Sequence, residues 1–100
     1  MITKEKIKDI VFTALDEINE QMEAEKQVVK SELTALFGKD ATLDSLGFIN
    51  LITTIEEGLD DELGIMVTIV DEKAMSRENS PFQTVETLIS YLVELVNEKT

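Results

Sequence analysis

Apolar residues near the start of the chain recur at intervals of three and four, which is the spacing of one face of an α-helix. These residues are Ile7, Ile10, Val11, Ala14, Leu15, Ile18 and Met22, and mostly charged or polar residues stand between them. The pattern predicts an amphipathic helix of roughly twenty residues that begins near Thr3. No Gly or Pro occurs between residues 20 and 30, so the sequence does not fix where this helix ends.

A second helix is predicted from Asp44–Ser45 to about Leu63. Projected at about 100° per residue, one side carries Phe48, Leu51, Ile52, Ile55 and Leu59, and the other carries Asn50, Thr54, Glu57 and Asp61. Leu46 breaks this division because it projects among the polar residues. We therefore expect Leu46 to be exposed beside Ser45.

The segments around this helix contain apolar residues without helical spacing. Residues 31–44 are predicted to form a connection held by Leu33, Leu36 and Phe37, with a turn at residues 38–40. The β-branched stretch Ile65–Val70 has no second strand to pair with, so an extended segment across the helices is expected. Residues 71–75 are predicted to form a short helix.

The last helix has two candidate starts. Ser80-Pro81-Phe82-Gln83 resembles a capping box with Pro at the first helical position, and Thr84 is an equal alternative. The expected buried stripe is Val85, Leu88, Ile89, Leu92, Val93 and Val96. Together these patterns predict an all-α fold: a small four-helix bundle of three long helices and one short one, with a long loop after the first helix.

Length and charge limit the kinds of partner. One hundred residues are expected to form a single domain, residues 1–100, and a monomer. The 21 acidic and 9 basic residues give a net charge of −12, which repels nucleic acid and anionic lipid and favours partners with basic patches. Acidity also has a simpler explanation, because it keeps a small domain in solution.

Missing residue types exclude several chemistries. Without Cys or His there is no disulfide, no thiol nucleophile, no zinc site of the usual kind and no Ser-His-Asp triad. An EF-hand counted from Asp40 would need Gly at Ser45 and Glu at Leu51, so no metal site is predicted. The start of the chain lacks a signal-peptide pattern and no apolar run is long enough to span a bilayer, so a cytoplasmic protein is expected.

The stretch Leu43-Asp44-Ser45-Leu46-Gly47 at the start of the second helix is the strongest candidate site. Taken alone, Asp44 or Ser45 is an ordinary N-cap, and Asp-Ser-Leu is a weak signal. The position at a helix start, the acidic chain and the isolated Leu46 together favour a functional site over an ordinary N-cap. A phosphodiester on Ser45 would lie near the unpaired N–H groups and the positive end of a helix.

These features resemble the acyl carrier proteins, whose modification site reads Asp-Ser-Leu at this structural place. The resemblance covers about residues 33–96 and includes Ile49, Leu51, Ile52, Ile55, Glu56, Glu57, Ile69, Asp71, Glu72, Ala74, Thr84, Val85, Leu88, Ile89, Tyr91 and Leu92. It implies a protein that is not itself an enzyme. Its Ser45 would hold a 4′-phosphopantetheine arm, added from coenzyme A by a phosphopantetheinyl transferase that reads Asp44 and Leu46.

Three positions depart from the family pattern. Gly47 and Asn50 stand where carriers of fatty acid synthesis usually have acidic residues, and Leu43 stands where a small residue is common. The resemblance therefore favours a specialised lipid, polysaccharide or secondary-metabolite pathway. Leu-Asp-Ser also resembles aminoacyl carriers, such as those that hold D-alanine, so the class of cargo stays open.

The polar side of the second helix is the expected surface for partner enzymes with basic patches. Its candidate residues are Asn50, Glu56, Glu57, Asp60 and Asp61. The alternatives are a merely solvated helix end, or an acidic interaction module without a prosthetic group. A hydrolase or transferase using paired carboxylates such as Asp40 and Asp44 as acid and base is disfavoured, because no sequence feature places the pair in a cleft.

Overall fold

Three helices form the described part of the protein. The computed structural model describes residues 2–22, 28, 30–36, 43–70 and 81–99. Helix α1 spans Lys4–Glu20, α2 spans Ser45–Leu63 and α4 spans Val85–Lys99. No strand occurs within these ranges, which confirms the all-α prediction for them. The predicted short helix at residues 71–75, Phe37 and the turn at residues 38–40 lie outside the described residues.

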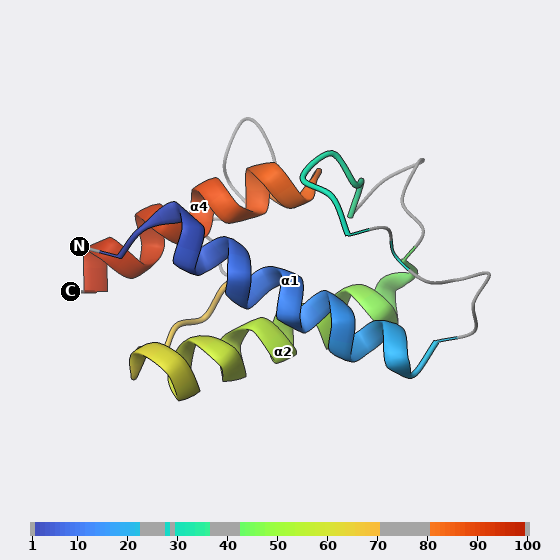
Figure 1. Ribbon diagram of the computed structural model, residues 1–100, viewed down its shortest axis with the longest axis horizontal. Helices are drawn as coiled ribbons and strands as arrows, with labels where there is room; N and C mark the ends of the chain where they lie inside the picture. Colours follow the sequence, from blue (N-terminus) through green and yellow to red (C-terminus); the bar gives the residue numbers. More distant parts are fainter. Residues whose placement is uncertain (1, 23–27, 29, 37–42, 71–80, 100) are drawn as a thin grey trace.

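Helix α1 lies between the other two helices and contacts both (Figure 1). It begins where the sequence predicted, because the Thr3 hydroxyl oxygen accepts a hydrogen bond from the Lys6 N–H at 3.3 Å. Its predicted apolar face is buried, with Met22 partly buried just beyond the helix. The helix ends at Glu20. In its last turn the Asn19 side-chain amide accepts a hydrogen bond from the Val28 N–H at 2.8 Å and donates one to the Val28 carbonyl at 2.9 Å.

Helix α2 has the predicted bounds. Its predicted apolar side is buried: Phe48, Leu51, Ile52, Ile55 and Leu59. The helix stops at Gly64, whose φ of 66° is left-handed, and the N–H groups of Gly64 and Ile65 donate back to the carbonyls of Asp60 and Leu59. The bond from the Gly64 N–H to the Asp60 carbonyl is that of an αL C-cap, in which Gly avoids the steric cost of a Cβ.

The segment that follows α2, predicted to be extended across the helices, has no regular secondary structure, and it packs against the core through Ile65 and Ile69 and, less completely, Val67 and Val70. Ile65 and Ile69 are buried, whereas Met66 is 80% exposed. The described residues therefore place the segment across the helices without pairing it to a strand.

Helix α4 begins at Val85, which corrects the expectation of a start at Ser80-Pro81 in favour of Thr84. Pro81 lies in a buried turn before the helix, and Ser80 is outside the described residues. The Thr84 hydroxyl oxygen accepts from the Thr87 N–H at 3.2 Å, and the Thr87 hydroxyl oxygen accepts from the Thr84 N–H at 3.0 Å. This reciprocal pair is the capping box.

The loop before residue 37 supplies hydrogen-bond acceptors for the first N–H groups of α4. The N–H groups of Val85 and Glu86 donate to the carbonyls of Thr34 and Glu32, at 3.0 and 2.9 Å. Leu36 is fully buried, but Leu33 is 80% exposed, so the prediction that Leu33 anchors this loop was wrong. Leu33 lies on a turn in which the Thr34 N–H donates to the Ser31 carbonyl, and that turn points its side chain outward.

Candidate functional site

The start of α2 is fixed by Asp44. Its backbone is extended, its exposed carboxylate accepts a hydrogen bond from the Gly47 N–H at 2.7 Å, and its carbonyl accepts the Phe48 N–H at 2.9 Å. Asp44 is therefore the N-cap. Ser45 is the first residue of the helix, and its side chain lies outside the described part of the structure.

Two buried side chains hold this helix start against the core. Leu43 and Phe48 are 8% and 7% exposed, and the Phe48 ring meets Phe82 edge to face, with 5.5 Å between the centroids. A Cβ at Gly47 would lie 3.1 Å from Leu43 Cδ2 and 3.2 Å from Asp44 Oδ1. The Gly therefore leaves room for both the Leu43 side chain and the capping carboxylate. These contacts fix the orientation of the first turn of α2 relative to the core.

Beside the cap, two apolar side chains face outward. Leu46 is 70% exposed, which confirms its prediction, and Ile49 is 51% exposed. Residues three apart on a helix lie on the same side, so the two extend one apolar surface from Asp44 along α2. Ile49 was expected only as part of the apolar rhythm of the helix, and its exposure was not predicted, although its spacing from Leu46 was a usable signal. Exposed apolar surface of this kind is typical of interaction sites.

The predicted partner surface is only partly available. Asn50, Glu57, Asp60 and Asp61 are exposed. Glu56 is half-buried, and its Oε2 accepts a hydrogen bond from the Ile69 N–H at 2.9 Å. Since Glu56 is engaged in holding the segment after α2, we leave it out of the partner surface.

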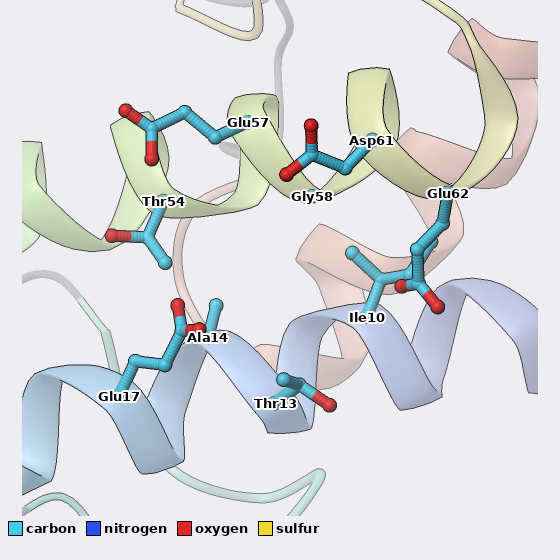
Figure 2. Close-up of a pocket in the computed structure, with 9 residues that line it drawn as sticks. All are labelled: Ile10, Thr13, Ala14, Glu17, Thr54, Glu57, Gly58, Asp61 and Glu62. Carbon is cyan, nitrogen blue, oxygen red and sulfur yellow. The ribbon is translucent and has the colours of Figure 1, made fainter.

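A groove of about 220 Å³ lies between α1 and α2 (Figure 2). It is lined by Ile10, Thr13, Ala14, Glu17, Thr54, Glu57, Gly58, Asp61 and Glu62. At one end Glu62 forms an ion pair with Lys6 at 3.1 Å. The sequence analysis did not identify this groove or the contribution of Glu17, because both depend on how the two helices pack.

Within the described ranges, no three or more acidic side chains are grouped so that they could hold a metal ion. None of the helices in those ranges is long and apolar enough to cross a bilayer. No family model, curated protein or solved structure matches the chain. Function is therefore inferred from the residues and their geometry.

Proposed function

We propose that the protein is a carrier of the acyl carrier type, and that a short helix at residues 71–75 completes a four-helix bundle. Ser45 holds a 4′-phosphopantetheine arm, and partner enzymes load and unload an acyl group carried on that arm as a thioester. The observation that carries the proposal is the place of Ser45 as the first residue of α2. It stands between Asp44, whose carboxylate caps the helix, and the exposed Leu46.

The described residues fit an arm at this place. A helix start offers backbone N–H groups and a positive dipole end to a phosphodiester, and the flanking Asp44 and Leu46 are exposed. When bound, the arm supplies the thiol that forms thioesters, and the chain has no Cys of its own. The residues of the chain hold the arm and bind the partner enzymes, and neither task needs a catalytic base. The lack of His therefore does not oppose this function.

Asp44 and Leu46 have different roles in the proposal. The Asp44 carboxylate keeps Ser45 at the first helical position by capping the helix, and it also presents a negative charge to a transferase. Leu46, with Ile49, presents an apolar contact surface next to the attachment point. Asn50, Glu57, Asp60 and Asp61 continue this surface toward basic patches of partner enzymes.

The test is intact mass spectrometry after incubation with coenzyme A and a phosphopantetheinyl transferase. The wild type is expected to gain the mass of one phosphopantetheinyl group. Ser45→Ala should gain none. Ser90→Ala, which changes an exposed serine of α4, is the matched control and should be modified like the wild type. Modification of Ser45→Ala, or an unmodified wild type under conditions that modify a known carrier, would contradict the proposal.

The exposed pair Leu46 and Ile49 also favours a second candidate, an acidic interaction module that carries no arm. This candidate predicts no gain of mass. It also predicts that Ser45→Ala binds a partner protein as well as the wild type does, whereas Leu46→Ala loses binding.

A further inference from the structure

The groove between α1 and α2 is separate from the helix start that bears Ser45. Its nearest residue on α2 is Thr54, nine positions along the helix, which corresponds to about 14 Å along the axis. Whatever binds in the groove therefore does not need an arm on Ser45. The groove shares Glu57 and Asp61 with the partner surface proposed above, but its other helix, α1, is not part of that surface.

The floor of the groove is apolar and its shape follows from one glycine. Ile10 and Ala14 of α1 lie opposite Gly58 of α2. A Cβ at residue 58 would lie 3.1 Å from Ile10 Cγ2, so the absence of a side chain lets the two helices approach closely here. A volume of about 220 Å³ is below the roughly 300–1,000 Å³ of pockets that hold a drug-sized molecule. The groove fits one or two protein side chains.

The rim of the groove is acidic on both helices. Its lining includes Glu17 on α1 and Glu57 and Asp61 on α2. In Figure 2 the Glu17 carboxylate points from α1 toward α2, whereas those of Glu57 and Asp61 lie beside α2. None of these three takes part in an ion pair within the part of the chain that the structure describes. Glu17 and Asp61 also lie in the last turns of their helices, where no basic residue offsets the negative end of the dipole.

We infer that this groove is a docking site for a basic, amphipathic segment of a partner protein. Ile10 and Ala14 are each 2% exposed. The aliphatic stem of a Lys or Arg therefore packs mainly on Thr13, Thr54 and Gly58 at the sides of the hollow. Its charged head reaches the carboxylates of the rim. Charge complementarity selects this occupant, because an acidic or neutral segment would leave the carboxylates uncompensated at two negative helix ends.

The experiment uses the full chain and a synthetic helical peptide with Lys on one face and Leu on the other. Its counterpart with Glu in place of Lys is the negative control. Binding is followed by amide chemical shifts in nuclear magnetic resonance, which also report where the peptide lies. The expected shifts centre on Thr13, Thr54 and Gly58.

Two double variants with the same net charge separate the groove from general attraction. Glu17→Gln with Asp61→Asn, the rim variant, removes charge from the rim, and Glu20→Gln with Glu86→Gln, the control variant, removes it from exposed residues that do not line the groove. The rim variant is expected to bind the peptide about fivefold more weakly at low salt, and the control variant less than about twofold more weakly. The rim variant should unfold at or above the wild-type temperature, since it removes one negative charge from each of two negative helix ends. The control variant removes one negative charge from the negative end of α1 and one from the positive end of α4, so its two effects on stability oppose each other.

Three results would overturn the inference. Equal weakening in both double variants would indicate general attraction by an acidic surface. Shifts centred on Leu46 and Ile49 would place the peptide on the other surface. Binding of the Glu peptide as tight as that of the Lys peptide would exclude charge as the selecting feature. Because the mass gain at Ser45 is measured separately, failure here leaves the carrier proposal as it stands.

Discussion

Glu56 gives the sharpest test of how the structure holds together after α2. Its Oε2 accepts a hydrogen bond from the Ile69 N–H at 2.9 Å, and the Ile69 side chain is fully buried. Replacing Glu56 with Ala removes the acceptor. The N–H of Ile69 then loses its charged partner, and the hold on the segment before residue 71 is weakened.

The expected cost follows from the environment of this bond. A hydrogen bond to a charged group contributes about 1.5–3 kcal/mol to stability. Glu56 is half-buried, so water can partly replace the carboxylate, and we expect Glu56→Ala to cost about 1–2 kcal/mol. For a chain of this length that lowers Tm by roughly 4–16 °C. Glu56→Gln keeps an acceptor oxygen and should cost about half as much.

Urea unfolding followed by circular dichroism measures this cost, and Glu57→Ala is the matched control. Glu57 is the next residue, it is exposed, and its truncation should change stability by less than about 0.5 kcal/mol. Hydrogen exchange at the Ile69 amide adds a local measurement, since its protection should fall in Glu56→Ala. If Glu56→Ala is no less stable than Glu57→Ala and Ile69 stays protected, the assigned role of Glu56 is incorrect.

Substitutions at two further positions, Asp44 and Gly64, test the ends of α2. Asp44→Ala removes the acceptor for the Gly47 N–H and should cost about 1 kcal/mol in thermal unfolding, whereas Asp44→Asn keeps an acceptor and most of that stability. Under the carrier proposal, modification of Asp44→Asn is slower although it is folded; equal rates would remove the Asp44 charge from transferase recognition. Gly64→Ala should cost about 1 kcal/mol, because the φ of 66° at this residue strains an L side chain. No clash adds to this cost, since no atom beyond its chain neighbours lies within 4 Å of the new Cβ. An unchanged Tm would show that this end of α2 relaxes.

Much of the site could be predicted because it depends on local signals. A side-chain oxygen at Asp44 followed by an apolar rhythm of three and four placed the start of α2 at Ser45. The same rhythm identified Leu46 as an exposed residue, and the structure agrees. Ile49 could have been found from its spacing to Leu46.

Other features could not be read from local signals. The Ser80-Pro81 pattern satisfies the rules for a helix start, but α4 begins at Val85 because carbonyls from the loop at residues 32–34 accept its first N–H groups. Leu33 resembles a core residue in sequence, yet its turn faces outward. Glu56 was grouped with its acidic neighbours, although its carboxylate bonds the chain thirteen residues later.

The sequence by itself determined the three long helices, most of their buried faces and the position of Asp44-Ser45-Leu46, because hydrophobic period and capping act within a few turns of one helix. On α4 the prediction included Val93, which is only partly buried, and omitted Tyr91 and Leu95, which are buried. Only the tertiary structure decided which helix start the loop satisfies, which acidic residue is engaged and that Glu17 shares a groove with Glu57 and Asp61. Those features depend on contacts between segments far apart in the chain. Packing and hydrogen bonding across that separation leave no periodic trace in the residues themselves.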